Sequence, residues 1–329
     1  MGKVGYPTDA ILAVTYRCDA KCEMCNIWQL KPQEYLTVDD YAKVPSTLDD
    51  INISGGEAFM RKDIVDIVKA VNEKCKGPRI VISTNGFRTE KIIGGMEELR
   101  RTIPNIGIGV SVDGIGEIHD KLRGVEGAFE KAMATLKQLK EREFKNVRIG
   151  FTTMNENAHE MKGVYELACA MGFQFTTAVA QNSEIYFSTQ ANDEVHNGKL
   201  HDALGYVIKK ELMSYHPKRW MRAYYESGSL VFNKERRRIL ECSAGIDFFY
   251  LAPEGLIYPC LTIPEPMGDL KGKSFEEVWE SEQAETMRKK IKGCEQCWMI
   301  CTARSALKKN LPGAFGWIAK EKIKSRLTN

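Results

Sequence analysis

Short runs rich in β-branched residues alternate with amphipathic stretches through the first half of this 329-residue chain. Such alternation predicts parallel strands that are joined by crossover helices. The expected strands are Ala10–Thr15, Asp50–Ser54, Arg79–Ser83, Ile106–Val112, Val147–Thr153 and Gln174–Val179. The expected helices between them are Thr37–Lys43, Lys62–Lys74, Thr89–Thr102, Ala128–Glu141 and Ala158–Met171. Six such units predict an α/β fold, a partial or closed TIM-like barrel that binds ligands at the carboxyl ends of its strands.

Polar and glycine-rich residues follow four of these expected strands. They are Cys18 after the first strand, Ser54-Gly55-Gly56-Glu57 after the second, Ser83-Thr84-Asn85-Gly86 after the third and Ser111-Val112-Asp113-Gly114 at the fourth. The carboxyl ends of parallel strands meet at one rim of a barrel, so these stretches should lie together. A purely structural chain would not need all four to be polar, and the rim is therefore expected to be a functional site.

The second half of the chain has a different pattern. Charged helical periodicity predicts helices at Asp193–Ser214 and Lys218–Glu226. Farther on, Phe248–Ala252 and Leu256–Tyr258 are predicted to form a β-hairpin, followed by a helix at Phe275–Lys292. This change of pattern predicts a small C-terminal domain, made of a hairpin and a helix, that follows a helical connecting region.

Charge and hydropathy exclude several classes of protein. The net charge is only +3, from 47 basic and 44 acidic residues, so nucleic acid is not expected as a partner. No signal peptide and no apolar stretch of membrane-spanning length is visible, which predicts a soluble, cytoplasmic protein. The basic, amphipathic tail from 306 to 329 is expected either to dock on the body or to contact a membrane surface or an anionic substrate.

Eight of the ten cysteines fall into two groups near the ends of the chain. The first group is Cys18, Cys22 and Cys25, and the second is Cys242, Cys260, Cys294, Cys297 and Cys301. In a cytosolic protein such groups indicate metal binding rather than disulfides. Cys75 and Cys169 stand alone in helical patterns and are expected to be small buried hydrophobic residues.

The first group has the spacing C-x3-C-x2-C on one loop. Three thiolates can hold three irons of a cubane cluster, which leaves the fourth iron open to a substrate or cofactor. A zinc site is the alternative, although no histidine lies near the loop to complete four ligands. The spacing alone leaves both metals open, and the position after the first barrel strand favours iron.

At these residues the chain resembles the radical S-adenosylmethionine (SAM) superfamily, whose motif is C-x3-C-x-aromatic-C. Met24 stands at the aromatic position, and methionine can also lie against a ring. The resemblance implies a [4Fe–4S] cluster on Cys18, Cys22 and Cys25, with the SAM amino and carboxylate groups on the open iron. One electron from the cluster would then split SAM into methionine and a 5′-deoxyadenosyl radical, which takes a hydrogen atom from a substrate.

Other stretches agree with this family and imply further SAM contacts. Gly55-Gly56-Glu57 resembles its GGE motif, which binds the SAM amino group through backbone oxygens and the glutamate. Ser111 and Arg123 lie in stretches that resemble sulfatase-maturating relatives, where the serine and the arginine contact SAM. Ser83 and Asn85 are expected to line the same pocket, while Asp113 could bind SAM or cap the following turn.

The second cysteine group resembles the SPASM/twitch domains of the same superfamily. A full SPASM domain has seven cysteines and two clusters, so five cysteines imply one auxiliary [4Fe–4S] cluster. The preferred ligands are Cys242, Cys260, Cys294 and Cys297, with Cys301 as an alternative or spare thiol. A zinc knuckle is the other interpretation. The expected division is a radical SAM partial barrel at 1–182, a connecting region at 183–240, an auxiliary domain at 241–305 and a tail at 306–329.

An auxiliary cluster with four protein ligands can accept the electron that remains on a substrate radical. The leading hypothesis is therefore oxidative C–H functionalisation or dehydrogenation of a small molecule, as in twitch-type alcohol oxidation in antibiotic sugar pathways. The alternative is modification of a peptide or protein side chain, such as a thioether or carbon–carbon crosslink. Only 17 residues precede Cys18, so no leader-binding domain is expected there. A non-catalytic iron–sulfur or zinc protein is the third hypothesis. If the protein is an enzyme, it is expected to need a reductant such as flavodoxin or ferredoxin. No acid or base is assigned.

Overall fold

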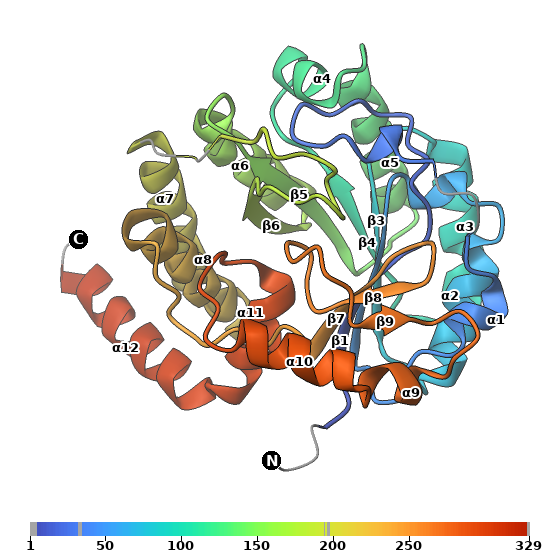
Figure 1. Cartoon of the computed structure of the whole chain (residues 1–329). Helices are drawn as coiled ribbons and strands as arrows, with labels where there is room; N and C mark the ends of the chain where they lie inside the picture. The colour runs from blue at the N-terminus through green and yellow to red at the C-terminus, as the bar shows by residue number, and fades with distance from the viewer. Residues whose placement is uncertain (1–4, 32–34, 194, 196–197, 328–329) are drawn as a thin grey trace.

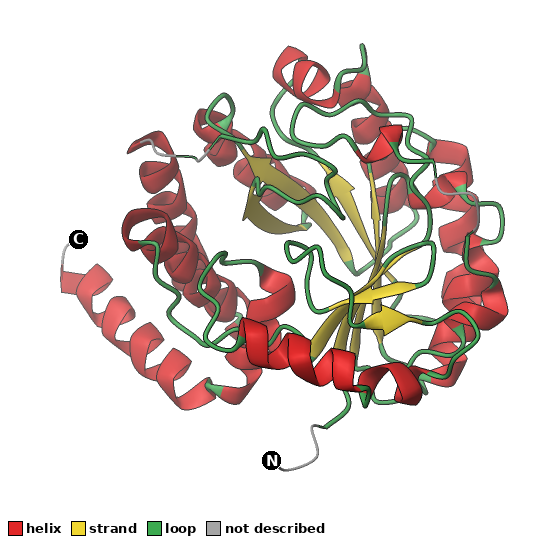
Figure 2. Ribbon diagram, in the orientation of Figure 1, coloured by secondary structure: helices red, strands yellow, loops and turns green. Residues whose placement is uncertain are grey.

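The computed structural model describes residues 5–31, 35–193, 195 and 198–327. Strands lie at the centre of the molecule and helices surround them (Figures 1 and 2). The first six strands are β1 (Asp9–Ala13), β2 (Asp50–Ser54), β3 (Arg79–Thr84), β4 (Gly107–Ser111), β5 (Val147–Thr153) and β6 (Gln174–Val179). They pair in parallel in chain order, and β6 does not pair back to β1 among the described strands. The predicted partial α/β barrel is therefore confirmed.

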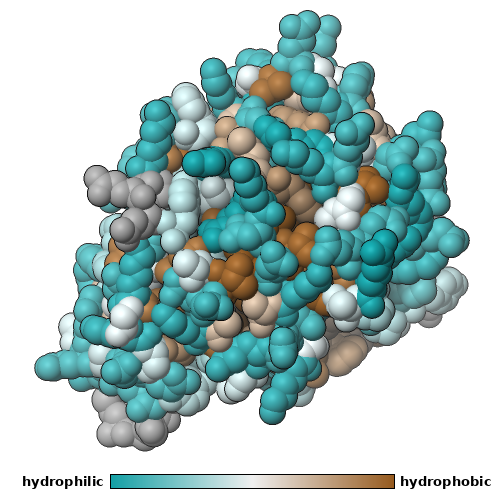
Figure 3. All heavy atoms as spheres, turned by 90° about the vertical axis from the view of Figure 1, so that its right-hand side faces the viewer, coloured by the Kyte–Doolittle hydropathy of each residue, from teal (hydrophilic) through white to brown (hydrophobic). Residues whose placement is uncertain are grey.

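The helices between these strands pack apolar faces on the sheet. They are α1 (Val38–Tyr41), α2 (Ile64–Lys74), α3 (Thr89–Thr102), α4 (Glu117–Arg123), α5 (Ala128–Glu141) and α6 (Met161–Met171), with short 3-10 turns η1 (Ile27–Gln29), η2 (Ala58–Met60) and η3 (Ala158–Glu160). In α2, the buried residues Ile64, Ile67, Val68 and Val71 recur at helical spacing. Hydrophilic residues predominate on the face that Figure 3 presents, which is the right-hand side of Figure 1.

The C-terminal domain extends the barrel sheet, a pairing that the local pattern did not predict. Strands β7 (Phe248–Leu251) and β8 (Leu256–Tyr258) form the expected hairpin, and β8 also pairs with β9 (Gly268–Asp269). However, β7 also pairs in parallel with β1, which gives one nine-stranded sheet. All four residues of β7 are buried, and a strand of this kind is stable only with neighbours on both sides and both faces.

Three helix boundaries differ from the sequence prediction. Helix α7 is Gly198–Met213, and residues 194, 196 and 197 of the predicted helix lie outside the described residues. Helix α8 runs from Pro217 to Glu235, longer than predicted. The predicted helix over 275–292 is two helices, α9 (Phe275–Trp279) and α10 (Glu282–Ile291). Ser281 separates them because its side chain accepts a hydrogen bond from the Ala284 backbone N–H and so begins the second helix.

The described part of the basic tail is mostly helical and is docked on the body. It comprises the end of α11 (Ile300–Lys309) and α12 (Leu311–Leu327), and α12 lies beside α7 and α8 (Figure 1). Ala314 and Ile318 are buried, and the Trp317 ring lies 5.4 Å from the Tyr224 ring. In the described part of the chain, no helix is both long enough and apolar enough to cross a bilayer.

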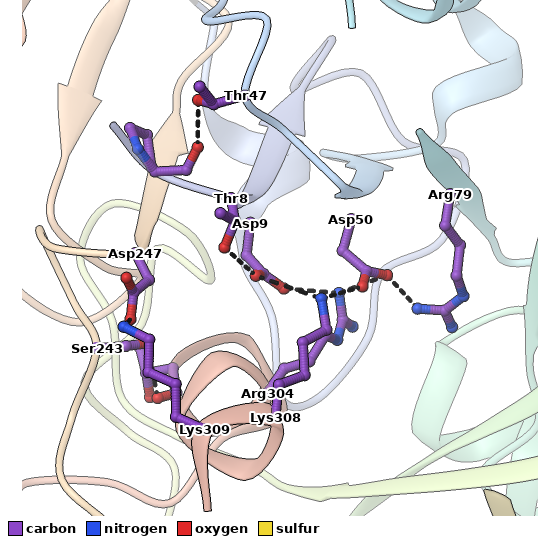
Figure 4. Close-up of polar contacts among 12 residues, drawn as sticks. Thr8, Asp9, Thr47, Asp50, Arg79, Ser243, Asp247, Arg304, Lys308 and Lys309 are labelled. Atoms are coloured by element: carbon purple, nitrogen blue, oxygen red, sulfur yellow. Dashed lines mark hydrogen bonds and ion pairs between the residues drawn. The ribbon is translucent and has the colours of Figure 1, made fainter. Parts of the chain in front are cut away.

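A cluster of ion pairs joins α11 to the amino-terminal ends of β1 and β2 (Figure 4). Asp9 and Asp50 are buried and stand opposite each other in the strand register. Arg304 Nη1 lies 3.5 Å from Asp9 Oδ1 and 3.3 Å from Asp50 Oδ1. Lys308 Nζ lies 2.8 Å from Asp50 Oδ2, and Arg79 pairs with the same carboxylate. Two adjacent buried carboxylates repel each other. The positive charges of Arg304 and Lys308 on α11 and of Arg79 on β3 offset this repulsion.

Candidate functional site

The loop that follows β1 carries the first three cysteines and is held by main-chain hydrogen bonds from three directions. The backbone N–H groups of Gly56 and Glu57 donate to the carbonyls of Thr15 and Arg17, at 2.7 and 2.8 Å. On its other side, the N–H groups of Lys21 and Glu23 donate to the carbonyls of Arg123 and Leu122 at the end of α4, each at 2.9 Å. A third bond joins Asn26 N–H to the Phe187 carbonyl at 2.7 Å. The thiols therefore sit on a braced loop at the carboxyl ends of the strands.

The three thiols of this loop are partly buried and need a positive partner before they can ionise. Burial raises the pKa of Cys18 and of Cys25 to about 12, and it also raises the pKa of Cys22. The Arg123 guanidinium opposes the shift at Cys22, and its Nη1 lies 3.6 Å from Cys22 Sγ. Metal ligation requires thiolates, which burial disfavours here. A metal group with net positive charge would stabilise these thiolates.

Gly55 and Gly56 let the second rim loop approach the cysteine loop more closely than any other residue could. A Cβ on Gly55 would lie 2.3 Å from the Thr15 carbonyl oxygen, and one on Gly56 would lie 2.3 Å from that of Arg17. Gly55 also has φ of +126°, a conformation that other residues rarely adopt. Both glycines of the predicted motif are thus required by contact with the cysteine loop.

Glu57 is fully buried and has internal hydrogen-bond partners. Its carboxylate accepts bonds from the backbone N–H groups of Phe59 and Asn85, at 3.1 and 2.8 Å, and from the Thr84 hydroxyl at 2.9 Å. Burial raises the pKa of Glu57 to about 7, against the lowering effect of these bonds. The carboxylate therefore joins the second and third rim loops, and a direct contact with a SAM amino group stays a prediction.

Arg123 lies at the end of α4 with its guanidinium between Asp113 and Cys22. Its Nη2 lies 2.5 Å from Asp113 Oδ2, and its buried Nε has no hydrogen-bond partner in the described structure. Asp113 is fully buried and also accepts the Thr152 backbone N–H at 2.7 Å. A guanidinium that contacts Cys22 and still has an unpaired nitrogen suits a carboxylate partner, which is the role predicted for Arg123.

The other predicted rim residues lie at the expected strand ends. Ser83 Oγ donates to Asn52 Oδ1 at 3.0 Å, and Ser111 ends β4 opposite Gly150 of β5. Asn85 Nδ2 donates to Asp19 Oδ1, within the cysteine loop, at 2.7 Å. The structure thus brings Asn85 against the cysteine loop, while contacts of Ser83 and Ser111 with SAM stay predictions.

Several residues that no sequence motif indicated also hold this site in place. Arg88 Nε donates to Asp19 Oδ2 at 2.7 Å, and Asn157 Nδ2 donates to the Asp113 carbonyl at 2.8 Å. His119 is fully buried, and its Nδ1 accepts the Asp113 backbone N–H at 3.0 Å. His119 lies in the same short stretch as Arg123, but nothing in the sequence indicated that a single histidine there bonds to the backbone of Asp113.

His119 should make the stability of the protein depend on pH. Burial, followed by the charge of Arg123, lowers its pKa from 6.5 to about 4. The neutral ring therefore stabilises the fold fully above pH 6.5, and this contribution is lost as the pH falls from 6.5 toward 4. The loss should total about 3 kcal/mol of unfolding free energy, which corresponds to a pKa lowered from 6.5 to about 4.

Urea unfolding of the cluster-free protein across that pH interval would measure this loss. A His119→Asn variant keeps a side-chain acceptor for the Asp113 N–H but does not titrate, so its free energy of unfolding should change less with pH. Equal pH dependence in the two proteins would show that His119 does not cause it.

The second cysteine group lies around the start of α11. Cys260, Cys297 and Cys301 are buried, while Cys242 and Cys294 are partly buried. Burial raises the pKa of Cys297 well above its ordinary value, and the neighbouring thiols of Cys301, Cys260 and Cys242 raise it further. These four thiols therefore lie close enough together to affect one another.

Two side chains fasten the main chain around these thiols. Arg238 donates from Nη1 to the Cys297 carbonyl, and Ser243, which follows Cys242, donates from Oγ to the Thr302 carbonyl at 2.9 Å. Among the described residues, no three His, Cys, Asp or Glu side chains converge tightly enough for one metal ion. A cubane attaches its thiolates to different irons, so its ligands span a wider space than those of zinc. Buried thiols in two braced loops fit that donor set.

A cavity of about 280 Å³ lies between the two cysteine groups. Val179 and Ala180 at the end of β6 form one side, and Gln296 and Trp298, which flank Cys297, form another. Ala180 also packs in one apolar cluster with Met24, beside Cys22 and Cys25. The cavity lining therefore includes residues that adjoin both cysteine groups, although no cysteine is part of the described lining.

A partial barrel with a three-cysteine loop at its rim and a cysteine-bearing extension defines a class of iron–sulfur enzymes that use SAM. The family model for the radical SAM superfamily matches residues 12–168, and that for the SPASM iron–sulfur cluster-binding domain matches residues 242–298. The chain therefore belongs to the radical SAM superfamily and carries a C-terminal SPASM domain. The two domains imply SAM and [4Fe–4S] clusters as cofactors.

Curated relatives include proteins of two kinds. The Fe-coproporphyrin III synthase of Methanosarcina barkeri is 34% identical over 167 residues, which are 47% of this chain and 39% of that protein. The AdoMet-dependent heme synthase of the same organism is 28% identical over 77% of this chain and 73% of its own length. The subtilosin biosynthesis protein AlbA of Bacillus subtilis is 26% identical over 84% of this chain and 60% of its own length. The match thus spans well under half of the first of these relatives.

Solved structures support the fold. Streptococcus suis SuiB bound to S-adenosylmethionine has a TM-score of 0.65 at 16% identity, with 86% of this chain and 68% of that chain covered. The protein anSMEcpe with bound AdoMet has a TM-score of 0.63 at 14% identity, with 95% and 100% covered. At such low identities the likeness concerns the arrangement of the backbone only.

Proposed function

We propose that this protein is a radical SAM enzyme that takes a hydrogen atom from a substrate bound between its two cysteine groups. A [4Fe–4S] cluster with SAM supplies the one-electron cleavage that generates a 5′-deoxyadenosyl radical. The observation that carries the proposal is the arrangement at the rim, where three thiols share one braced loop and one of them, Cys22, contacts a buried guanidinium with an unpaired Nε. No zinc or electron-carrier role accounts for that guanidinium.

The residues of this chain then have distinct tasks. Cys18, Cys22 and Cys25 would hold the cluster, and Arg123 would orient the SAM carboxylate while Asp113 holds the guanidinium in place. Gly55 and Gly56 keep the second rim loop against the cysteine loop, where their backbone can meet the SAM amino group. Ser83, Asn85, Ser111 and Glu57 remain proposed as further residues of the SAM pocket.

Formation of 5′-deoxyadenosine tests this proposal directly. Anaerobically reconstituted protein that is reduced with dithionite and given SAM should release 5′-deoxyadenosine and methionine in equal amounts. Protein that is treated identically but left without iron and sulfide is the control and should release neither. A protein with a full complement of iron and no 5′-deoxyadenosine would contradict the proposal.

The auxiliary site supports oxidation as the overall outcome. Four protein thiolates would leave no iron open, and such a cluster accepts an electron rather than binding a substrate. We propose Cys242, Cys260, Cys297 and Cys301 as this set, in place of the predicted set that contained Cys294. The support is that Cys297 and Cys301 are buried and that nearby thiolates at Cys242 and Cys260 would raise the pKa of both.

Iron analysis distinguishes the two ligand sets. The Cys301→Ala variant is expected to lose the auxiliary cluster, which is about four irons per chain, whereas Cys294→Ala should keep it. The iron and sulfide contents of the two variants, reconstituted side by side, give the comparison. Loss of iron in Cys294→Ala and retention in Cys301→Ala would restore the set predicted from the spacing.

Peptide modification is the second candidate, and two of the relatives support it. They are the subtilosin biosynthesis protein AlbA and the sporulation killing factor maturation protein SkfB, the latter 22% identical over 88% of this chain.

Flavodoxin or ferredoxin remains proposed as the reductant, and the four-part division of the chain also stays a prediction. Membrane contact through the tail stays a prediction too, although Lys308 and Lys309 of α11 are paired with Asp50 and Asp247.

A further inference from the structure

Arg238 is a buried cation beside the second cysteine group. It lies just after helix α8, which packs against α11 (Figure 1), and 6% of the residue is exposed. Its Nε donates to the Leu240 carbonyl at 3.1 Å, and its Nη1 donates to the Cys297 carbonyl at 2.5 Å. Nη1 and Nη2 also donate to the hydroxyl and the carbonyl of Thr302, each at 3.4 Å. All of these acceptors are neutral.

The charge of Arg238 has no carboxylate partner among the described residues. Arg123 and Arg238 are the two arginines that are buried in the described structure, and Arg123 is paired with Asp113. The contacts of Arg238 are instead the neutral oxygens just given. A guanidinium stays charged in proteins, and hydrogen bonds to carbonyls lower the cost of burying it without neutralising it. The surroundings of Arg238 therefore suit a negatively charged group.

The thiols of the second group can provide that negative charge when they hold a cluster as thiolates. Arg238 contacts the main chain of Cys297 directly, and its other partner Thr302 follows Cys301. The serine that follows Cys242 also donates to the Thr302 carbonyl, at 2.9 Å. Three of the four proposed ligands thus belong to chain segments that meet at this guanidinium.

Two further features favour a negative charge at this place. Cys301 lies in the first turn of α11, and the amino-terminal end of a helix carries a partial positive charge. Glu241 and Glu295 stand next to cysteines in the sequence, but both are exposed, so water and salt screen their opposing charges.

Trp298 separates the guanidinium from solvent. The Arg238 Cζ atom lies 5.1 Å from the centre of the Trp298 ring, and Trp298 is 4% exposed. The indole N–H donates to the Tyr225 carbonyl at 3.0 Å, and the ring stacks on the Tyr225 ring with centroids 5.8 Å apart. Gly228 allows this close packing, because a Cβ there would lie 2.2 Å from the indole. The charge of Arg238 therefore acts through a poorly polarisable medium, where it is felt more strongly than in water.

We propose that Arg238 is the counter-ion of the auxiliary [4Fe–4S] cluster and raises its reduction potential. This inference rests on the proposed function, in which Cys242, Cys260, Cys297 and Cys301 hold that cluster. Four thiolates give such a cluster a net negative charge, and reduction by one electron adds another. A fixed cation stabilises the more negative, reduced form more than the oxidised form. The electron that remains on a substrate radical is therefore accepted more readily.

A redox titration followed by electron paramagnetic resonance tests this role. It uses the Cys18→Ala/Cys22→Ala/Cys25→Ala background, reconstituted with iron and sulfide, so that the auxiliary cluster alone gives the signal. Arg238→Gln in this background keeps two N–H donors but removes the charge. The equilibrium constant for reduction should fall about tenfold, which is a midpoint potential lower by about 59 mV for one electron.

Two variants separate the charge from the hydrogen bonds and from nonspecific effects. Arg238→Lys keeps the positive charge but changes the arrangement of the donors, so most of the potential should be retained. Arg237→Gln is the matched control, because Arg237 is the neighbouring residue, is exposed, and is paired with Glu235 at 2.9 Å. Its removal should leave the potential unchanged.

The iron content and the potentials together decide the outcome. Equal potentials with and without the Arg238 charge would overturn the inference, and so would an Arg238→Lys potential as low as that of Arg238→Gln. If Arg238→Gln binds no cluster, full iron in Arg238→Lys supports the counter-ion role, whereas loss of iron in both variants rejects it. Absence of a four-iron cluster in the background with Arg238 intact counts against the auxiliary cluster of the proposed function itself.

Discussion

Replacement of Gly56 by alanine is expected to lower the formation of 5′-deoxyadenosine by about 100-fold or more, as misplacements near 1 Å do in active sites. The new Cβ would lie 2.3 Å from the Arg17 carbonyl oxygen and 2.7 Å from the Arg17 carbonyl carbon. Both are main-chain atoms directly before Cys18, so they cannot rotate away as a side chain would. The cysteine loop must shift, and the three thiols would no longer match one cluster.

The rate of 5′-deoxyadenosine formation and the iron content per chain, measured on the same preparations, test this expectation. Gly94→Ala on α3 is the matched control, because a Cβ there meets no atom within 4 Å. That variant should keep the wild-type rate and iron content. Wild-type activity in Gly56→Ala would mean that the two rim loops are not held together as tightly as the structure indicates.

Replacement of Arg304 by methionine is expected to lower the free energy of unfolding by about 4 kcal/mol, the cost typical of removing one partner of a buried ion pair. Arg304 lies within 3.5 Å of both Asp9 and Asp50, whose side chains are 2% and 8% exposed. Without the guanidinium, two neighbouring buried carboxylates keep Lys308 and Arg79 as partners. Burial already raises the pKa of Asp9 despite Arg304 and Lys308, so the loss of Arg304 adds to an existing cost.

Urea unfolding of the cluster-free protein measures this effect without a contribution from bound iron. Lys137→Met is the control, since the Lys137–Glu141 pair is exposed and 3.9 Å apart, and it should change stability by less than about 1 kcal/mol. Combining Arg304→Met with Asp9→Asn should recover part of the loss, because it removes the carboxylate that is left with Lys308 at 3.8 Å as its ion-pair partner. An Arg304→Met variant as stable as Lys137→Met would contradict the proposed role of the ion pairs.

Local patterns in the sequence were sufficient to predict the six barrel strands and most of the helices that cover them. Buried strands and amphipathic helices leave a periodic pattern within a few residues. The glycines and cysteines of the rim were also predictable, because the resemblance to radical SAM proteins resides in short motifs. Met24 departs from that motif but is buried where it packs with Ala180 and Leu122.

Contacts between distant segments could not be predicted in the same way. The pairing of Asp9 and Asp50 with Arg304 joins residues separated by more than half of the chain. The residues that line the cavity likewise come from the loop after β6, from helix α8 and from the segment before α11, which no local pattern brings together. The internal partners of Glu57 also depend on the third rim loop, so the motif alone could not predict its bonds to Thr84 and Asn85.

The pairing of β1 with β7 has a consequence for how the chain is made. Strand β1 leaves the ribosome well before its partner at Phe248–Leu251, which is translated only after all six barrel strands. At about 5–20 residues per second, this side of β1 stays bare for tens of seconds. Nascent barrels of this design need shielding by chaperones during that interval, and a premature stop codon ahead of Phe248 would leave an aggregation-prone product rather than a shorter working enzyme.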